Sequence, residues 1–173
     1  MSEIREARLQ KANSLISKGF ASYAESFKVS HTTQFLIKEF DYLENGQEQD
    51  FSVSIAGRVM AKRVMGKIAF FTISDQEGQI QLYLDKHIIN LNSENQKLLS
   101  FEDIKEIVDI GDWIGVFGTI KKTNKGELSI KVGKWEMLSK SLKPLPDKWH
   151  GLTDIEKRYR QRYLDLIVNP HSK

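Results

Sequence analysis

The stretch GRVMAKRVMGKIAFFTISD, residues 57–75, contains two segments of alternating polarity separated by a turn. Upstream of the turn, the apolar or small residues occupy every second position: Val53, Ile55, Gly57 and Val59. Downstream of Met65-Gly66-Lys67 the same pattern continues with Ala69, Phe71 and Ile73. Because side chains alternate between the two faces of a strand, this pattern predicts an antiparallel hairpin with one buried face.

Three more segments extend the same pattern along the chain. A third strand is predicted over 79–84 and two more over 112–123 and 126–138, the last pair joined at Asn124-Lys125-Gly126. Between the third and fourth strands, residues 92–108 show helical spacing in an apolar stripe made of Leu98, Phe101, Ile104 and Val108. This order predicts a mainly β protein, a five-stranded OB-fold Greek-key barrel with a helix between strands 3 and 4. An SH3-like barrel or an incomplete sandwich is the alternative, and the long helical insert counts against both.

The segments on either side of the barrel divide the chain into three predicted parts. Residues 1–48 form an N-terminal helical extension, with helices over Ile4–Lys18 and from Thr33 to near Gly46. Residues 49–140 form the barrel, and residues 141–173 combine a proline-spaced linker with a helix over 154–166. In the first helix Leu9, Ala12 and Ile16 fall on one side and most cations on the other. We keep two interpretations of this helix, a packing element and a basic arm for RNA.

Composition excludes several classes of site in this 173-residue chain, which is 40% hydrophobic. Without cysteine there is no disulfide, thiolate metal site or thiol nucleophile. His31, His87, His150 and His171 are scattered without the spacing of metal ligands. No apolar run is long enough for a membrane span, and the charged N-terminus lacks the core of a secretory signal. The sequence therefore predicts a cytoplasmic protein with no membrane partner.

Positive charge is concentrated in the two predicted hairpins, although the net charge is only +3. Residues 57–67 contain no acid, and Glu127 is the single acid in 118–135. The cations of the two segments are Arg58, Lys62, Arg63 and Lys67 in the first and Lys121, Lys122, Lys125, Lys131 and Lys134 in the second. Two basic hairpins on one barrel indicate a polyanion as the partner.

Alternation places one aromatic ring on the outer face of the second strand. If Ala69, Phe71 and Ile73 face the core, Phe70 faces outward, where we expect it beside Arg58, Gln81 and Tyr83. OB-folds bind single-stranded nucleic acid on this face, where an aromatic ring stacks on a base and polar side chains read its edge. The alternative is that Phe70 belongs to the core beneath the N-terminal helices.

Several strings resemble the N-terminal portion of the bacterial-type lysyl-tRNA synthetases, a class II family: GRVMAKRVMGK, GQIQLYL, IGDWIGVFG, GELSI and KPLPDKWHGLTDIEKRYRQRYLDLIVNP. This resemblance implies an anticodon-binding OB domain for tRNA(Lys), followed by a catalytic domain that activates lysine with ATP and Mg²⁺. It also implies a homodimeric full-length enzyme. The sequence itself contains no glycine-rich phosphate loop, no metal-spaced carboxylates and no nucleophile with a base. We therefore expect this chain to bind tRNA without catalysing, and to hold no cofactor or metal.

The resemblance also implies roles for individual residues. Phe70 would stack on an anticodon base, Arg58 and Gln81 would read the central uracil, and Glu127 would contact a neighbouring base. As the only acid in its hairpin, Glu127 is equally suited to a salt bridge. The predicted nucleic-acid-binding residues are Arg58, Phe70, Gln81, Glu127, Tyr83, Lys62, Arg63, Lys67, Lys122 and Lys125. A free-standing OB protein that binds single-stranded nucleic acid is the alternative function, and the linker and helix of 141–173 count against it.

Overall fold

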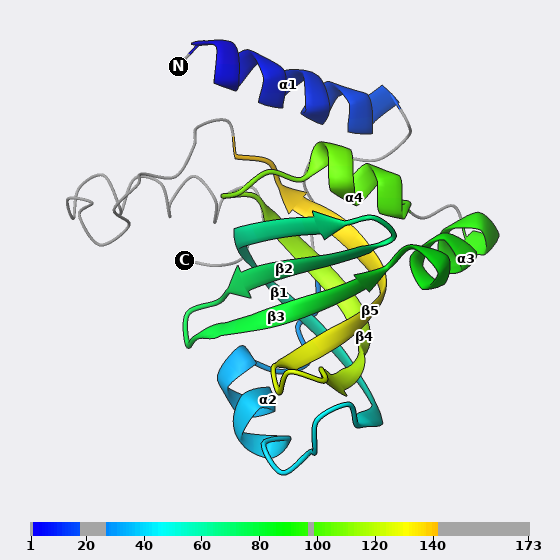
Figure 1. Cartoon of the computed structure of the whole chain (residues 1–173). Coiled ribbons are helices and arrows are strands. Elements are labelled where there is room, and N and C mark those ends of the chain that lie inside the picture. The colour runs from blue at the N-terminus through cyan, green and yellow to red at the C-terminus, as the bar shows by residue number, and fades with distance from the viewer. Residues whose placement is uncertain (1, 18–26, 97–98, 142–173) are drawn as a thin grey trace.

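Five strands close into a barrel in the order β1-β2-β3-β5-β4 in the computed structural model, which describes residues 2–17, 27–96 and 99–141 (Figure 1). The strands are β1 (Glu48–Met65), β2 (Ile68–Ser74), β3 (Gln79–Asp85), β4 (Trp113–Lys122) and β5 (Leu128–Ser139). Every pairing is antiparallel except that of β3 with β5, which is parallel and closes the barrel. The predicted OB-type barrel is confirmed, and the closed sheet with its helical insert excludes an incomplete sandwich.

The core lies inside the barrel and follows the predicted alternation. In β2 and β3 every second residue is buried, and those of β2 are Ala69, Phe71 and Ile73, all fully inaccessible. Trp135 of β5 is also buried, and its Nε1 donates a hydrogen bond of 3.2 Å to the backbone oxygen of Ser100. Period-two burial in β2 and β3 leaves their alternate residues on the outer surface, where we look for the site.

One end of the barrel is covered by α2 (Thr33–Glu39), shown at the bottom of Figure 1. Leu36, Phe40 and Leu43 supply the buried face, as the sequence predicts. The helix is shorter than the predicted 33–46, because Phe40 leaves helical geometry (φ −111°, ψ 17°). A turn from the backbone NH of Leu43 to the oxygen of Phe40 then brings Leu43 back to the core.

Two helices, rather than the single predicted one, connect β3 and β4. They are α3 (Lys86–Gln96) and α4 (Phe101–Ile107). Ser100 starts α4 with a capping box, in which its side chain accepts from the NH of Asp103 and the Asp103 carboxylate accepts from the NH of Ser100. A cap satisfies helix-terminal NH groups and begins a new helix. Phe101, Ile104 and Val108 are buried as predicted, while Leu98 lies outside the described residues.

At the other end of the barrel α1 (Ser2–Ser17) lies across α4 (Figure 1). Its contacts are polar: Lys11 Nζ pairs with Asp109 Oδ1 at 2.8 Å, and Arg8 donates to the oxygen of Ser141 at 3.3 Å. Leu9, expected on an apolar side, is 42% exposed, whereas Ala12 is buried. These contacts support the interpretation of α1 as a packing element, and the side chain of Ile16, the third predicted apolar residue, lies outside the described residues.

A buried cluster of Asp109, Asp112 and Lys140 lies beneath α1, where β5 ends; we call it the Lys140 cluster. Lys140 Nζ is 2.6 Å from Asp109 Oδ2 and 2.5 Å from Asp112 Oδ2. Burial raises the pKa of Asp112 even though Lys140 opposes the shift. Burial also acts to raise the pKa of Asp109, but hydrogen bonds from Lys11 and Lys140 outweigh it, so this pKa is lowered.

The predicted linker and helix of residues 142–173 lie outside the described residues. Within the described ranges, no helix combines the length and apolar character that crossing a membrane requires.

Candidate nucleic-acid interface

Two parallel rows of outward-facing side chains cross β1, β2, β3, β5 and β4. Directly paired residues on neighbouring strands point to the same face of a sheet. The strand register therefore defines the rows: Arg63, Phe70, Tyr83 and Lys131 form the first, and Thr72, Gln81, Ser129 and Lys121 form the second. We call this surface the aromatic face. It contains Phe70, Gln81 and Tyr83, as strand alternation predicts.

The rings of Phe70 and Tyr83 meet edge to face, with centroids 5.7 Å apart and planes at 67°. The guanidinium carbon of Arg63 lies 5.0 Å from the Phe70 ring centre, and Lys121 Nζ lies 5.2 Å from that of Tyr83. Phe70 is half-buried and does not belong to the hydrophobic core, so its assignment to the core beneath the N-terminal helices is wrong. Two aromatic rings flanked by cations form the arrangement on which unpaired bases stack.

Gln81 is held beside these rings by a serine that the sequence analysis did not select. Gln81 Nε2 donates to Ser129 Oγ at 3.0 Å, and Ser129 Oγ donates to the backbone oxygen of Glu127 at 3.2 Å. Ser129 is fully buried. A signal for it was present, because Glu127, Ser129 and Lys131 alternate with the buried Leu128, Ile130 and Val132 and so share the outer face.

Arg58 does not lie beside Phe70, so that expectation is wrong. The antiparallel register places Arg63 opposite Phe70 and places Arg58 opposite Ser74 on one side and Trp113 on the other. The guanidinium carbon of Arg58 lies 5.6 Å from the Trp113 ring centre, and Arg58 is only 6% exposed. In a hairpin, residues at similar separations from the turn become partners. Arg58 lies farther from the turn at Gly66 than Arg63 does, so it pairs with Ser74 and not with Phe70, although alternation along β1 alone does not reveal this.

Comparison with known proteins agrees with this geometry. Residues 53–138, which contain almost all of the barrel, match the tRNA anticodon-binding family, described as an OB-fold nucleic acid binding domain. The barrel belongs to the tRNA anticodon-binding OB-fold family. Over its full length the chain is 92% identical to the lysine–tRNA ligase of Prochlorococcus marinus strain MIT 9312 and spans 34% of that protein. It is 56% identical to the lysine–tRNA ligase of Synechococcus sp. strain RCC307, of which it spans 33%.

The remaining predicted cations of this anticodon-binding OB-fold differ in their surroundings. Lys62 Nζ donates to the backbone oxygens of Lys105 and Val108 at 2.6 and 2.7 Å, so it caps the end of α4. Burial lowers the pKa of Lys62. Lys122 Nζ donates to the oxygens of Asp41 and Leu43 at 3.1 and 3.0 Å. Both lysines therefore have structural contacts that alternation along a strand does not reveal.

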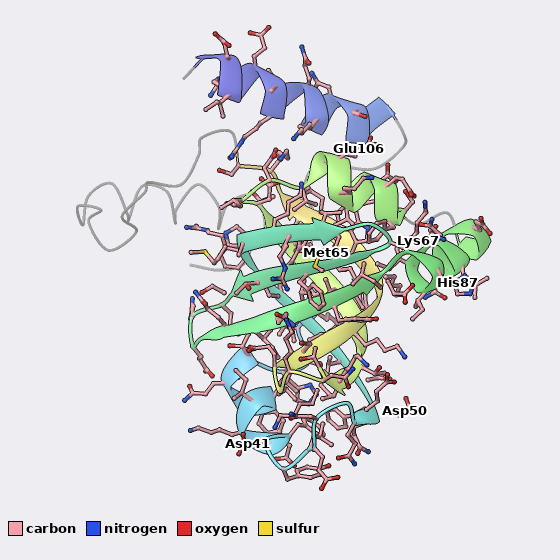
Figure 2. The ribbon with its side chains drawn as sticks, in the orientation of Figure 1. Asp41, Asp50, Met65, Lys67, His87 and Glu106 are labelled. Atoms are coloured by element: carbon pink, nitrogen blue, oxygen red, sulfur yellow. The ribbon has the colours of Figure 1, made fainter. Side chains whose placement is uncertain are left out.

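Two other predicted lysines are exposed at turns of the OB-fold. Lys67 follows Gly66 at the β1–β2 turn. Figure 2 shows Lys67 far from Asp41, which lies at the end of the barrel that α2 covers. Lys125 precedes Gly126 (φ +92°) in the β4–β5 turn. Met65, on the same face of β1 as Arg63, is 56% exposed. These positions leave both lysines accessible to a phosphate backbone.

Acidic residues modify the charge of the OB-fold surface. Glu48 pairs with Lys121 and Lys131 at 3.1 and 3.0 Å, and the hydrogen bond from Lys131, followed by that from Lys121, lowers the pKa of Glu48. Glu127 is exposed, and its backbone is fixed to Thr123 by two hydrogen bonds of 3.0 Å. In the part of the chain that the structure describes, the Glu127 carboxylate makes no ion pair, which removes the support for a salt-bridge role.

Proposed function

We propose that this chain is the anticodon-reading part of a lysine–tRNA ligase and that it binds the anticodon loop of tRNA(Lys) on the aromatic face. The observation that carries the proposal is the Phe70–Tyr83 pair beside the anchored amide of Gln81, on a barrel of the anticodon-binding family. Stacking contributes affinity that tolerates any base, and an amide fixed next to the stacked base adds selection by hydrogen bonding. Both elements are needed to read a base rather than merely hold it.

The predicted residues divide into four groups in this proposal. Phe70 and Tyr83 supply stacking surfaces, and Gln81 reads the edge of a uracil. Glu127 reads a neighbouring base, because its exposed carboxylate follows the β4–β5 turn at the border of the aromatic face. The exposed cations contact phosphates: Arg63, Lys67 and Lys125. Arg58, Lys62 and Lys122 contribute positive potential, while their side chains serve contacts within the protein.

The activity of the whole protein extends this proposal beyond the chain, which spans about a third of the length of its relatives. We propose that the full-length protein activates lysine with ATP and Mg²⁺, transfers it to tRNA(Lys), forms a homodimer and works in the cytoplasm. The residues described by the structure include no group of three or more His, Cys, Asp or Glu side chains arranged to hold a metal ion. Independently of that observation, we propose that ATP and Mg²⁺ are bound by the full-length protein and not by this chain.

A fluorescence anisotropy titration tests the proposal directly. The chain is titrated against an anticodon stem-loop with three uracils and against the same hairpin with its central uracil replaced by cytosine, at two salt concentrations. A preference for uracil that persists at the higher salt supports base reading, because hydrogen bonds to base edges do not depend on released counterions. Equal binding that disappears with salt would contradict the proposal and favour a free-standing OB protein that binds single strands through charge.

A further inference from the structure

The amide of Gln81 lies on the aromatic face in a fixed orientation, and that orientation is set from below by Ser129. Gln81 carries an acceptor oxygen and a donor nitrogen that are almost equal in size, so packing alone does not distinguish the two flipped states of the amide. Ser129 Oγ lies 3.0 Å from one of these atoms. The orientation of the amide therefore depends on whether the Ser129 hydroxyl accepts a hydrogen bond from Gln81 or donates one to it.

The hydroxyl of Ser129 has one proton, and a second contact determines where it goes. Ser129 Oγ is 3.2 Å from the backbone oxygen of Glu127, which can only accept. In the structure Ser129 directs its proton at the Glu127 oxygen, which also accepts from the NH of Thr123 at 3.0 Å, and it presents a lone pair to Gln81, so that Nε2 occupies the inner position. Since Ser129 is fully buried, water does not replace either partner at low cost.

The consequence is a defined hydrogen-bond pattern on the outer surface. Oε1 of Gln81 faces outward as an acceptor, and within the described residues it receives no hydrogen bond. The second proton of Nε2 remains a donor beside it. The Watson–Crick edge of uracil offers a donor at N3 and acceptors on either side, which complements this pair. Cytosine presents an acceptor at N3 beside an amino donor, and that pattern matches the flipped amide instead.

We propose that Ser129 is a positioning residue for base selection: by accepting from Gln81 Nε2 it holds the amide in the state that binds uracil and excludes the state that binds cytosine. The proposal rests on the proposed function, because it assumes that a base stacks on the aromatic face next to Gln81. Specificity here is a difference between two affinities, and it arises from blocking the competing state of the amide.

The test is the ratio of dissociation constants for the cytosine and uracil stem-loops, measured by anisotropy with the full 173-residue chain. Ser129→Ala frees the amide to flip, so we expect the ratio to fall by about tenfold, the value of one hydrogen bond. Affinity for the cytosine loop should rise or stay constant. Ser129→Thr keeps the hydroxyl and should retain the ratio. Thermal melts of both variants establish that each is folded.

Two further measurements separate a positioning role from a structural one. In a Gln81→Ala background, Ser129→Ala should leave the ratio unchanged, since there is no amide left to orient. A purely structural serine would instead weaken both loops equally and leave the wild-type ratio intact, which would overturn the proposal. If Phe70→Ala has no effect on binding to either loop, the proposed function itself fails. If Phe70→Ala weakens binding and the Ser129→Ala ratio matches the wild type, only the role of Ser129 fails.

Discussion

Phe70 and Phe71 are consecutive residues of β2 and lie on opposite sides of the barrel wall. Phe71 is fully buried in the core, whereas the Phe70 ring lies outside it, 5.7 Å from the ring of Tyr83. One backbone position thus separates a residue that stabilises the fold from one available to a ligand. The pair provides a matched comparison, because the side chains are identical and only their environments differ.

Replacing each phenylalanine with alanine should therefore have different effects. Phe70→Ala removes a stacking surface, and we expect binding of the uracil stem-loop to weaken by ~1–3 kcal/mol while the melting temperature changes little. Phe71→Ala leaves a cavity in the core and should destabilise the fold by ~3–5 kcal/mol. Anisotropy titrations and thermal melts of both variants check this. Loss of stability in Phe70→Ala with unchanged affinity would contradict the position of the interface.

The cations of the two hairpins should separate into two classes. Lys125 is exposed at a turn, so Lys125→Gln should reduce the slope of log affinity against log salt by about 1 if it contacts one phosphate, without changing stability. Lys62 caps α4, and Lys62→Met should leave the slope unchanged while costing ~1 kcal/mol of folding free energy, because the carbonyls of Lys105 and Val108 lose their donor at one exposed and one part-buried contact. Salt-dependent titrations and urea unfolding distinguish the two effects. A changed slope for Lys62→Met alone would reverse this assignment.

The Lys140 cluster should depend on its central cation. Lys140 is 4% exposed, and Lys140→Met leaves the carboxylates of Asp109 and Asp112 without it. Removing one partner of a buried ion pair typically costs ~3–5 kcal/mol. The exposed Lys38→Met is the control and should be nearly neutral. Adding Asp112→Asn to Lys140→Met should recover part of the loss, and urea unfolding that shows no recovery would contradict the charge-based explanation.

The docking of α1 should depend on charge. Lys11→Gln removes the 2.8 Å contact with Asp109, so we expect faster amide hydrogen exchange in α1 without loss of protection in β1–β5. Arg5→Gln, at an exposed position of the same helix, is the control. Because the pKa of Asp109 is lowered, its contribution is complete above the ordinary value of 3.8 and is lost as the pH falls through its folded-state pKa. A loss of amide protection in α1, measured relative to the unstructured exchange rate at each pH, between neutral pH and pH 5 would exclude this attachment, because Asp109 remains ionised over that range.

Much of the fold follows from local pattern, and the helices show where that pattern ends. The alternation of apolar and polar residues in the sequence predicted all five strands, since the two-residue period of a strand is a property of the backbone itself. The apolar stripe of 92–108 predicted helix but not its division, because the capping box at Ser100 uses two polar side chains that carry no periodic signal. The end of α2 at Glu39 was missed for a similar reason, since Leu43 reaches the core through a turn.

The sequence alone determined which residues of β2 and β3 face outward, and it therefore placed Phe70, Gln81 and Tyr83 on one surface. Only the tertiary structure decided which outward residues become neighbours. Register put Arg63, not Arg58, against Phe70, and the closing of β3 on β5 brought Ser129 to Gln81 across 48 positions of the chain. The folded backbone likewise directed Lys62 and Lys122 toward carbonyl groups. Alternation is fixed between adjacent residues, whereas contacts between distant segments depend on turns, strand pairing and the burial of polar groups that must find partners.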